Sequence, residues 1–106
     1  MDLQRMQQRA SEAAQVLQAC SHQGRLMLLC QLSQEELCVG ALQARLGIQQ
    51  PSLSQQLGIL RRQGLIESRR YGQQVFYQVA DERVRNLVDS FYQIFCDSNF
   101  SNTQQG

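Results

Sequence analysis

Apolar residues recur at intervals of three and four along most of the chain, which is the spacing that places them on one face of a helix. The pattern predicts helices over residues 3–19, 22–33, 38–46 and 51–63. A last helix is predicted to follow Asp81, where its apolar residues continue at the same spacing. The chain is therefore expected to be mostly α-helical.

Residue types at the ends of these segments fit helix termini. Ser21 and Asp81 are expected to cap the helices that follow them, because their side chains can accept hydrogen bonds from free N–H groups. Gly47 can close the third helix in a left-handed conformation. Pro51 fits the first turn of the fourth helix, where its missing N–H costs nothing, and Gly64 is expected to end that helix.

The third and fourth helices are short and are joined by a turn of about four residues, which is the geometry of a helix-turn-helix. The period of the pattern then changes, and residues 65–70 and 75–79 are typical of strands, with Gly72 in the segment that can turn between them. A hairpin directly after a helix-turn-helix is a wing. The predicted fold is thus α+β, mostly α with a β-hairpin wing: four helices, two strands and a final helix.

The length of 106 residues suits one domain, which we place at residues 1–97. Residues 98–106 are polar and are expected to form a disordered tail. No apolar run approaches the roughly 18 residues of a membrane span, and the N-terminus does not resemble a secretory signal. We therefore expect a cytoplasmic protein that does not enter a membrane.

The first and last predicted helices each carry a long apolar stripe. Its members are Leu3, Met6, Ala10, Ala13 and Leu17 on the first helix, and Val84, Leu87, Val88, Phe91, Ile94 and Phe95 on the last. One possibility is that the stripes pack only within their own domain. A core this small cannot cover both, however, and a large exposed apolar patch usually marks an interface. We expect a two-fold homodimer through the terminal helices, which would set two recognition helices for adjacent major grooves.

Charge is distributed unevenly although the net charge is only +1. Residues 45–78 contain five arginines and one glutamate, a local net charge of +4. Arginine is suited to bidentate contact with phosphate and guanine. This local excess indicates either an ordinary solvated face or, within a winged helix-turn-helix, a single face that binds double-stranded DNA.

Candidate DNA-binding residues lie in the fourth helix and the wing. Serine and glutamine near the helix start can bond base edges or phosphates, whereas arginines at its end and on the wing fit the DNA backbone or the minor groove. The set is Gln50, Ser52, Ser54, Gln55, Gln56, Arg61, Arg62, Arg69, Arg70 and Gln73.

Four segments resemble the ArsR/SmtB family of bacterial winged-helix repressors. They are residues 21–26 (SHQGRL), 50–57 (QPSLSQQL), 60–66 (LRRQGLI) and 75–77 (VFY). The resemblance extends over about residues 5–97 and implies a homodimer that represses an operon until an inducer binds. One departure is Gln56, where the family usually has histidine.

The metal sites of that family are incomplete here. Cys38 lies in a segment similar to the thiolate motif for arsenite and soft metals, but the second cysteine of the motif is replaced by Gly40. The other family site uses histidine and carboxylates of the last helix, and the only histidine of the chain, His22, is elsewhere. We expect no cofactor and no metal, with Cys38 as a weak metal candidate.

Cys30 and Cys96 resemble the cysteine pair of the sulfur-responsive branch of the family, the BigR, SqrR and HlyU type. The resemblance implies that a disulfide or polysulfide bridge between these thiols releases DNA, with a reactive sulfur species or an oxidant as inducer. Because a direct disulfide requires Cα atoms about 4.4–6.8 Å apart, closing it would shift one helix against the other.

Other interpretations remain open from the sequence. A cysteine on an apolar helix face can be a small buried hydrophobe, which is how we interpret Cys20. The inducer could be arsenite or a soft metal held by Cys38 with Cys20 or Cys96, and a winged helix could serve as a protein-interaction module. An enzyme is not expected, because no nucleophile is paired with a base and no glycine-rich phosphate loop is present.

Overall fold

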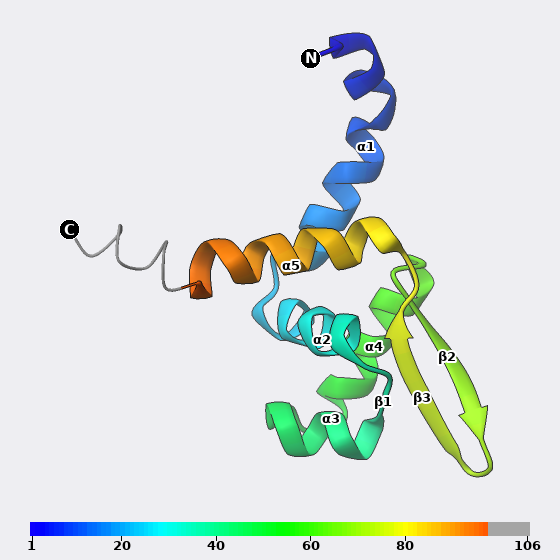
Figure 1. Cartoon of the computed structure of the whole chain (residues 1–106). Helices are drawn as coiled ribbons and strands as arrows, with labels where there is room; N and C mark the ends of the chain where they lie inside the picture. Colours follow the sequence, from blue (N-terminus) through cyan, green and yellow to red (C-terminus); the bar gives the residue numbers. More distant parts are fainter. Residues whose placement is uncertain (98–106) are drawn as a thin grey trace.

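The computed structural model describes residues 1–97. The elements in order are α1 (Leu3–Cys20), α2 (Gln23–Gln34), β1 (Leu37–Cys38), α3 (Val39–Leu46), α4 (Ser52–Arg62), β2 (Ile66–Tyr71), β3 (Gln74–Val79) and α5 (Glu82–Cys96) (Figure 1). The winged helix-turn-helix expected from the sequence is confirmed. The tail predicted at residues 98–106 lies outside the described residues.

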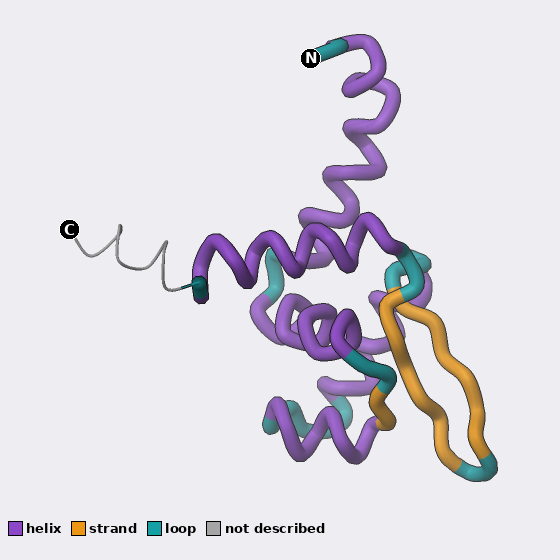
Figure 2. The backbone as a smooth tube through the Cα atoms, viewed as in Figure 1, coloured by secondary structure: helices purple, strands orange, loops and turns teal. Residues whose placement is uncertain are grey.

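The wing is part of a three-stranded antiparallel sheet, which corrects the two-stranded prediction. The strand order is β1-β3-β2, and Leu37 of β1 lies opposite Tyr77 of β3 (Figure 2). Cys38 had been expected to begin a helix; it lies in β1 and precedes α3 as its N-cap residue. A two-residue strand is too short to show an alternating pattern, and it exists because β3 offers its open edge for pairing.

The core surrounds α2, which contacts the other helices and the sheet. Leu28, Leu29 and Leu32 of α2 are fully buried, as are Leu42 of α3 and Val88 of α5. Each such side chain contributes about 1.5–3 kcal/mol of transfer free energy. The helix-turn-helix and α5 are therefore held to a common support, and the position of α4 depends on the packing of α2.

Three of the five residues predicted at helix ends have the roles expected of them, whereas Pro51 is the N-cap residue of α4 and not part of its first turn. Asp81 accepts a hydrogen bond from the Arg83 N–H at 2.8 Å, and Gly47 has a left-handed φ of 68° after α3, while Gly64, φ 75°, follows α4. The prediction for Ser21 was wrong. His22 is the N-cap of α2, and its Nδ1 accepts a hydrogen bond from the Arg25 N–H. Ser21 instead closes α1, because only two residues separate the helices.

Arg85 of α5 joins three elements. Its Nη1 donates to the Ser33 carbonyl at the end of α2, and its Nη2 donates to the Val79 carbonyl of β3 at 2.9 Å. Both carbonyls lie at the end of an element, where the backbone needs partners from outside it. The guanidinium therefore fixes the start of α5 to α2 and to the sheet.

Both terminal helices expose apolar side chains. α1 extends away from the rest of the molecule, and α5 crosses above α2 (Figure 1). Leu3 of α1 is 70% exposed and Phe95 of α5 is 69% exposed. Among the described residues, no helix is both long and apolar enough to cross a bilayer.

Candidate nucleic-acid interface and thiol site

The first turns of α4 present polar side chains on the face opposite its leucines. Ser52, Ser54 and Gln55 are exposed, whereas Leu53 and Leu57 are buried. This division is what a helix needs in order to read DNA with one face while it packs with the other. The candidates on this helix are therefore in positions that a duplex could reach.

Gln50 organises the start of α4 rather than extending freely. Its Oε1 accepts hydrogen bonds from the Ser54 N–H at 3.0 Å and from the Ser54 Oγ at 2.7 Å. The side chain thus supplies the helix cap that Pro51 lacks. Both residues remain exposed, so the pair forms a rigid polar corner at the beginning of the helix.

Gln56 is half-buried and is bonded to a residue that the sequence analysis did not single out. Its Oε1 accepts from Arg25 Nη1 at 3.4 Å. Arg25 also donates from Nε to the Ala19 carbonyl at 3.0 Å and from Nη2 to the Gln18 carbonyl at 3.2 Å. Arg25 therefore links the end of α1 to the exposed face of α4.

Arg69 of the wing is paired with a carboxylate. Its Nε and Nη2 donate to Glu36 at 2.7 and 3.2 Å, and its guanidinium lies 5.1 Å from the centre of the Tyr71 ring. The hydrogen bonds from Arg69 to Glu36 raise the pKa of the arginine. Glu36 stands immediately before β1, so the pairing of β1 with β3 brings the acid to the wing.

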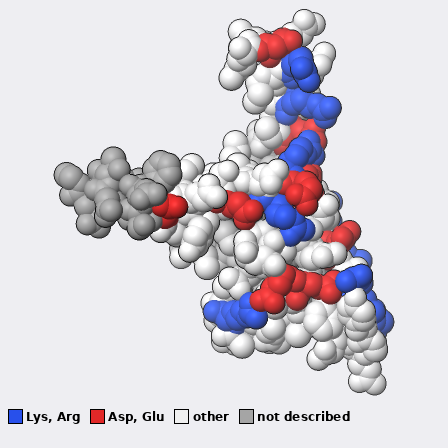
Figure 3. Space-filling view, in the orientation of Figure 1, with Lys and Arg blue, Asp and Glu red and all other residues white. Residues whose placement is uncertain are grey.

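Arginines and acids are interspersed along the face drawn in Figure 3, from α1 down to the wing. Arg45 is paired with Glu35, so two of the five arginines of the basic segment are neutralised by acids from just outside it. Within residues 1–97, Arg61, Arg62 and Arg70 are exposed and form no salt bridge, and Gln73 is exposed in the hairpin turn. The unpaired basic charge thus lies at the end of α4 and on β2.

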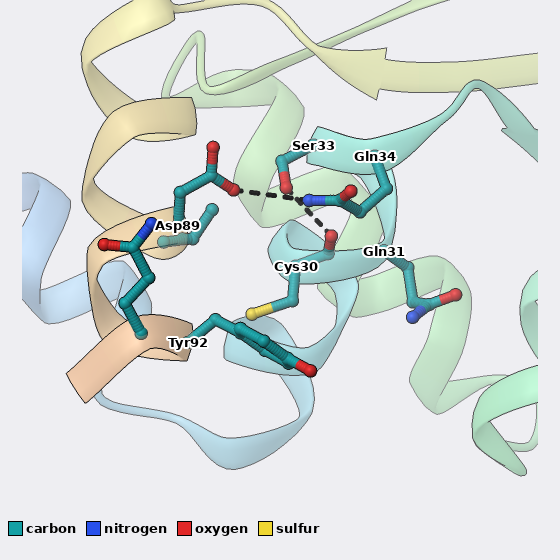
Figure 4. A pocket seen from close by; sticks show the side chains of 8 residues that line it. Cys30, Gln31, Ser33, Gln34, Asp89 and Tyr92 are labelled. Carbon is teal, nitrogen blue, oxygen red and sulfur yellow. Dashed lines mark hydrogen bonds between the residues drawn. The ribbon is translucent and has the colours of Figure 1, made fainter. Parts of the chain in front are cut away.

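Cys30 lies on α2 beside a pocket between α2 and α5. The pocket has a volume of about 490 Å³ and is lined by Cys30, Gln31, Ser33, Gln34, Val88, Asp89, Tyr92 and Gln93 (Figure 4). The thiol is half-buried. Burial, followed by the nearby Cys96 and Asp89, raises the pKa of Cys30, so the neutral thiol is favoured.

Cys96 is the last residue of α5 and is exposed. It lies close enough to Cys30 for a charge on its sulfur to raise the pKa of that residue. All four cysteines are free thiols. The structure therefore brings together one half-buried and one exposed thiol on two helices that pack against each other.

The other two cysteines have different surroundings. Cys20 is buried in the core, and burial first, then Cys30, raises its pKa. Cys38 is half-buried opposite Phe76 in the sheet. Among residues 1–97, no three His, Cys, Asp or Glu side chains are gathered in a way that could hold a metal ion.

Comparison with known proteins identifies the family. Residues 22–68 match the family described as bacterial regulatory protein, arsR family. The biofilm growth-associated repressor of Agrobacterium fabrum is 47% identical over 91 residues, covering 86% of this chain and 78% of that protein. The transcriptional activator HlyU of Vibrio cholerae is 37% identical, covering 93% of this chain and 92% of its own. The chain belongs to the arsR family.

Solved structures of related proteins have the same fold. The transcriptional repressor BigR from Xylella fastidiosa superposes with a TM-score of 0.86 at 46% identity, covering 91% of this chain and 98% of that one. A homodimeric winged helix-turn-helix DNA-binding domain from Mycobacterium bovis gives a TM-score of 0.74 at 30% identity, covering 92% and 90%. The resemblance to the BigR and HlyU type is confirmed, and this arsR-family chain is a DNA-binding transcriptional regulator.

Three residues of this arsR-family chain that shape the candidate sites were missed from the sequence. Glu36 and Arg25 act through partners 33 and 31 residues away in the chain, so no local pattern indicates them. Asp89 could have been found, because it lies seven residues before Cys96, two helical turns along the same face of the last helix.

Proposed function

We propose that this protein is a transcriptional repressor that binds operator DNA as a homodimer and leaves it when Cys30 and Cys96 become bridged. The bridge is a disulfide or a polysulfide. The observation that carries the proposal is the position of α5, which ends in Cys96, packs against the helix of Cys30 and exposes an apolar surface suited to a second copy. A change at the thiols therefore acts on the helix that would set the spacing of the dimer.

The DNA contacts would come from α4 and the wing. The exposed Ser52, Ser54 and Gln55 would face base edges in the major groove, with Gln50 and the amide nitrogen of Gln56 beside them. Arg61, Arg62 and Arg70 would contact phosphates, and Gln73 would follow with the tip of the wing. Arg69 would join them after exchanging Glu36 for a phosphate.

A second copy would cover the groove between α1 and α5. The groove has a volume of about 500 Å³, and Ala13, Val16, Leu17, Val84 and Leu87 line its apolar part. Apolar surface of this kind is usually buried in an interface. The homodimeric winged helix-turn-helix DNA-binding domain from Mycobacterium bovis, which has the same fold, supports this assembly.

The bridging step conserves atoms and electrons. The thiolate of one cysteine attacks an S–S bond of the incoming disulfide, persulfide or polysulfide, and the displaced sulfur leaves as a thiol or sulfide carrying the proton. For a disulfide bridge, the second cysteine then attacks the modified cysteine sulfur and releases the added group as a thiol or sulfide. For a polysulfide bridge, it attacks a sulfur farther along the added chain, so that the sulfurs before that point stay in the bridge and the rest leaves as a thiol or sulfide. The two protein thiols lose two electrons, which the cleaved S–S bond receives.

The test is release from duplex DNA selected from a random pool by the reduced protein. Polysulfide should weaken binding of the unmodified chain, measured by fluorescence anisotropy, and leave binding by Cys30→Ser and Cys96→Ser unchanged. Cys20→Ser and Cys38→Ser are the matched controls and should respond like the unmodified chain. Release that persists in Cys30→Ser would overturn the dithiol mechanism, and tight stoichiometric binding of arsenite or a soft metal that is lost in Cys38→Ser would favour a soft-metal site.

A further inference from the structure

The pocket beside Cys30 contains one charged side chain, and that charge is negative. Asp89 supplies the carboxylate, while the rest of the lining consists of amides, a hydroxyl, a phenol, an apolar side chain and the thiol. Gln34 Nε2 donates to Asp89 Oδ1 at 3.3 Å and so holds the carboxylate in place (Figure 4). Among the described residues, Oδ2 of Asp89 accepts no hydrogen bond.

The arginines near this pocket do not cancel its charge. Arg45 donates to Gln31, one of the lining residues, but is itself paired with Glu35. Arg85 donates to the backbone carbonyl of Ser33 and is paired with Glu82 at 3.4 Å. Each arginine is neutralised by an acid of its own, so Asp89 remains the charge that an incoming molecule meets.

We propose that this pocket is a binding site for small sulfur compounds that carry an ammonium group, with Asp89 as the residue that selects them for reaction at Cys30. The inference rests on the proposed thiol function and names the class of compound that reaches the thiol. An ammonium group two carbons from an S–S bond would pair with Asp89 while a sulfur lies against Cys30. The volume of about 490 Å³ is within the range of small-molecule sites.

Selection follows from the sign of the charge. A cation entering the pocket is attracted by Asp89, whereas a carboxylate on the same skeleton is repelled by it. The amide groups of Gln31, Gln34 and Gln93 can bond either type of compound and do not discriminate. Discrimination between the two charges is therefore assigned to one side chain.

The reaction itself is thiol–disulfide exchange. The Cys30 thiolate attacks one sulfur of the compound and forms a mixed disulfide, and the other sulfur leaves as a thiol that takes up the proton lost by Cys30. Cys30 is oxidised and the S–S bond is reduced. In a chain that lacks Cys96, the mixed disulfide is the end product, which makes the first step measurable alone.

The experiment compares three disulfides that share a two-methylene spacer on each side of the S–S bond and differ in charge: cystamine (cationic), 2-hydroxyethyl disulfide (neutral) and 3,3′-dithiodipropionate (anionic). The full chain with Cys96→Ser is treated with each, and peptide mass spectrometry measures the rate at Cys30. Each rate is divided by that of the same reagent with the urea-unfolded chain. The corrected rate with cystamine should exceed that with dithiodipropionate by about five- to tenfold at low salt, and the ratio should fall as salt is added.

The decisive comparison uses Asp89→Asn in the Cys96→Ser chain. The ratio of the two corrected rates should fall close to one. Loss of the carboxylate also makes the Cys30 thiolate easier to form, but this accelerates all three reagents alike and leaves the ratio unchanged. Glu67→Gln, which removes an equal charge on the wing, should keep the full ratio.

A ratio that is the same in the Asp89→Asn chain and its parent would overturn the proposal. So would a parent ratio near one. Either result would leave the bridging of Cys30 and Cys96 standing, because polysulfide-driven release from DNA is measured separately. If polysulfide did not release the protein from DNA while the ratio of the two rates remained high, the proposed signal would be wrong and the charge-selective pocket would stand.

Discussion

The guanidinium of Arg69 and the carboxylate of Glu36 form two hydrogen bonds, at 2.7 and 3.2 Å, between the wing and the residue before β1. The acid thereby occupies the donors that Arg69 would offer to a phosphate. The negative charge of Glu36 also lies on the wing surface that carries Arg69. Glu36 is therefore expected to oppose DNA binding by the wing.

Glu36→Gln should strengthen binding to duplex DNA several-fold at low salt, because it frees Arg69 and removes a negative charge from the wing. The slope of log affinity against log salt concentration should become steeper by up to about the amount that one additional phosphate contact contributes. Fluorescence anisotropy at a series of salt concentrations measures both effects. Glu12→Gln, which removes an acid from the ion pair between Glu12 of α1 and Arg83 of α5 and leaves the pair of Arg69 and Glu36 intact, should change neither. Weaker binding by Glu36→Gln would show instead that the pair holds the wing in its binding position.

Leu17→Glu should shift the protein toward monomer, because Leu17 is 52% exposed in the apolar groove between α1 and α5. A charge there cannot be buried against a second copy without a large desolvation cost. Sedimentation velocity over a range of protein concentrations measures the change. Met27→Glu is the matched control, since Met27 is similarly exposed but lies outside the groove. An unchanged assembly in Leu17→Glu would place the interface elsewhere.

Arg25→Ala should lower the free energy of unfolding by about 1–2 kcal/mol, because it removes hydrogen bonds from a charged donor to the Ala19 and Gln18 carbonyls and to Gln56. Urea denaturation measures the loss. DNA affinity should fall as well, since Gln56 would no longer be held against the body of the domain. Arg25→Lys retains the charge but not the fork of donors and should recover only part of the stability. Equal stability of Arg25→Ala and the parent would contradict this reading of the contacts.

The free energy of unfolding should decrease as the pH rises above about 8.5, the ordinary pKa of a thiol. Burial raises the pKa of Cys20 in the folded state, so the folded chain holds this proton more tightly than the unfolded chain does. That contribution is complete below the unfolded pKa and is lost as the pH rises through the folded one. Urea denaturation between pH 7 and 10 measures the slope. Cys20→Ala should flatten it more than Cys38→Ala, whose side chain lies outside the core.

Much of the fold could be predicted because helix periodicity, capping residues and the turn glycines agreed with one another. Asp81, Gly47 and Gly64 were correctly interpreted from their residue types alone, since their roles depend on the adjacent backbone. The strand at Leu37 could not be predicted in this way, because only its partner Tyr77 across the sheet makes it a strand.

The candidate site could likewise be predicted only where neighbouring residues determine it. The exposure of Ser54 and Gln55 follows from the leucine spacing of α4. The pairing of Arg69 with Glu36 depends on how β1 is placed, which the local charge count over residues 45–78 did not include. Contacts between distant segments determine which of the arginines are available, and a pattern along one segment carries no information about them.

The sheet order β1-β3-β2 leaves β2 as an open edge, with backbone groups that another chain could pair with. Such edges promote aggregation unless charged side chains interrupt them. β2 carries Glu67, Arg69 and Arg70, and the opposite edge strand is only two residues long. The charges that make the wing a candidate for DNA contact therefore also discourage wings of separate molecules from joining into a continuous sheet.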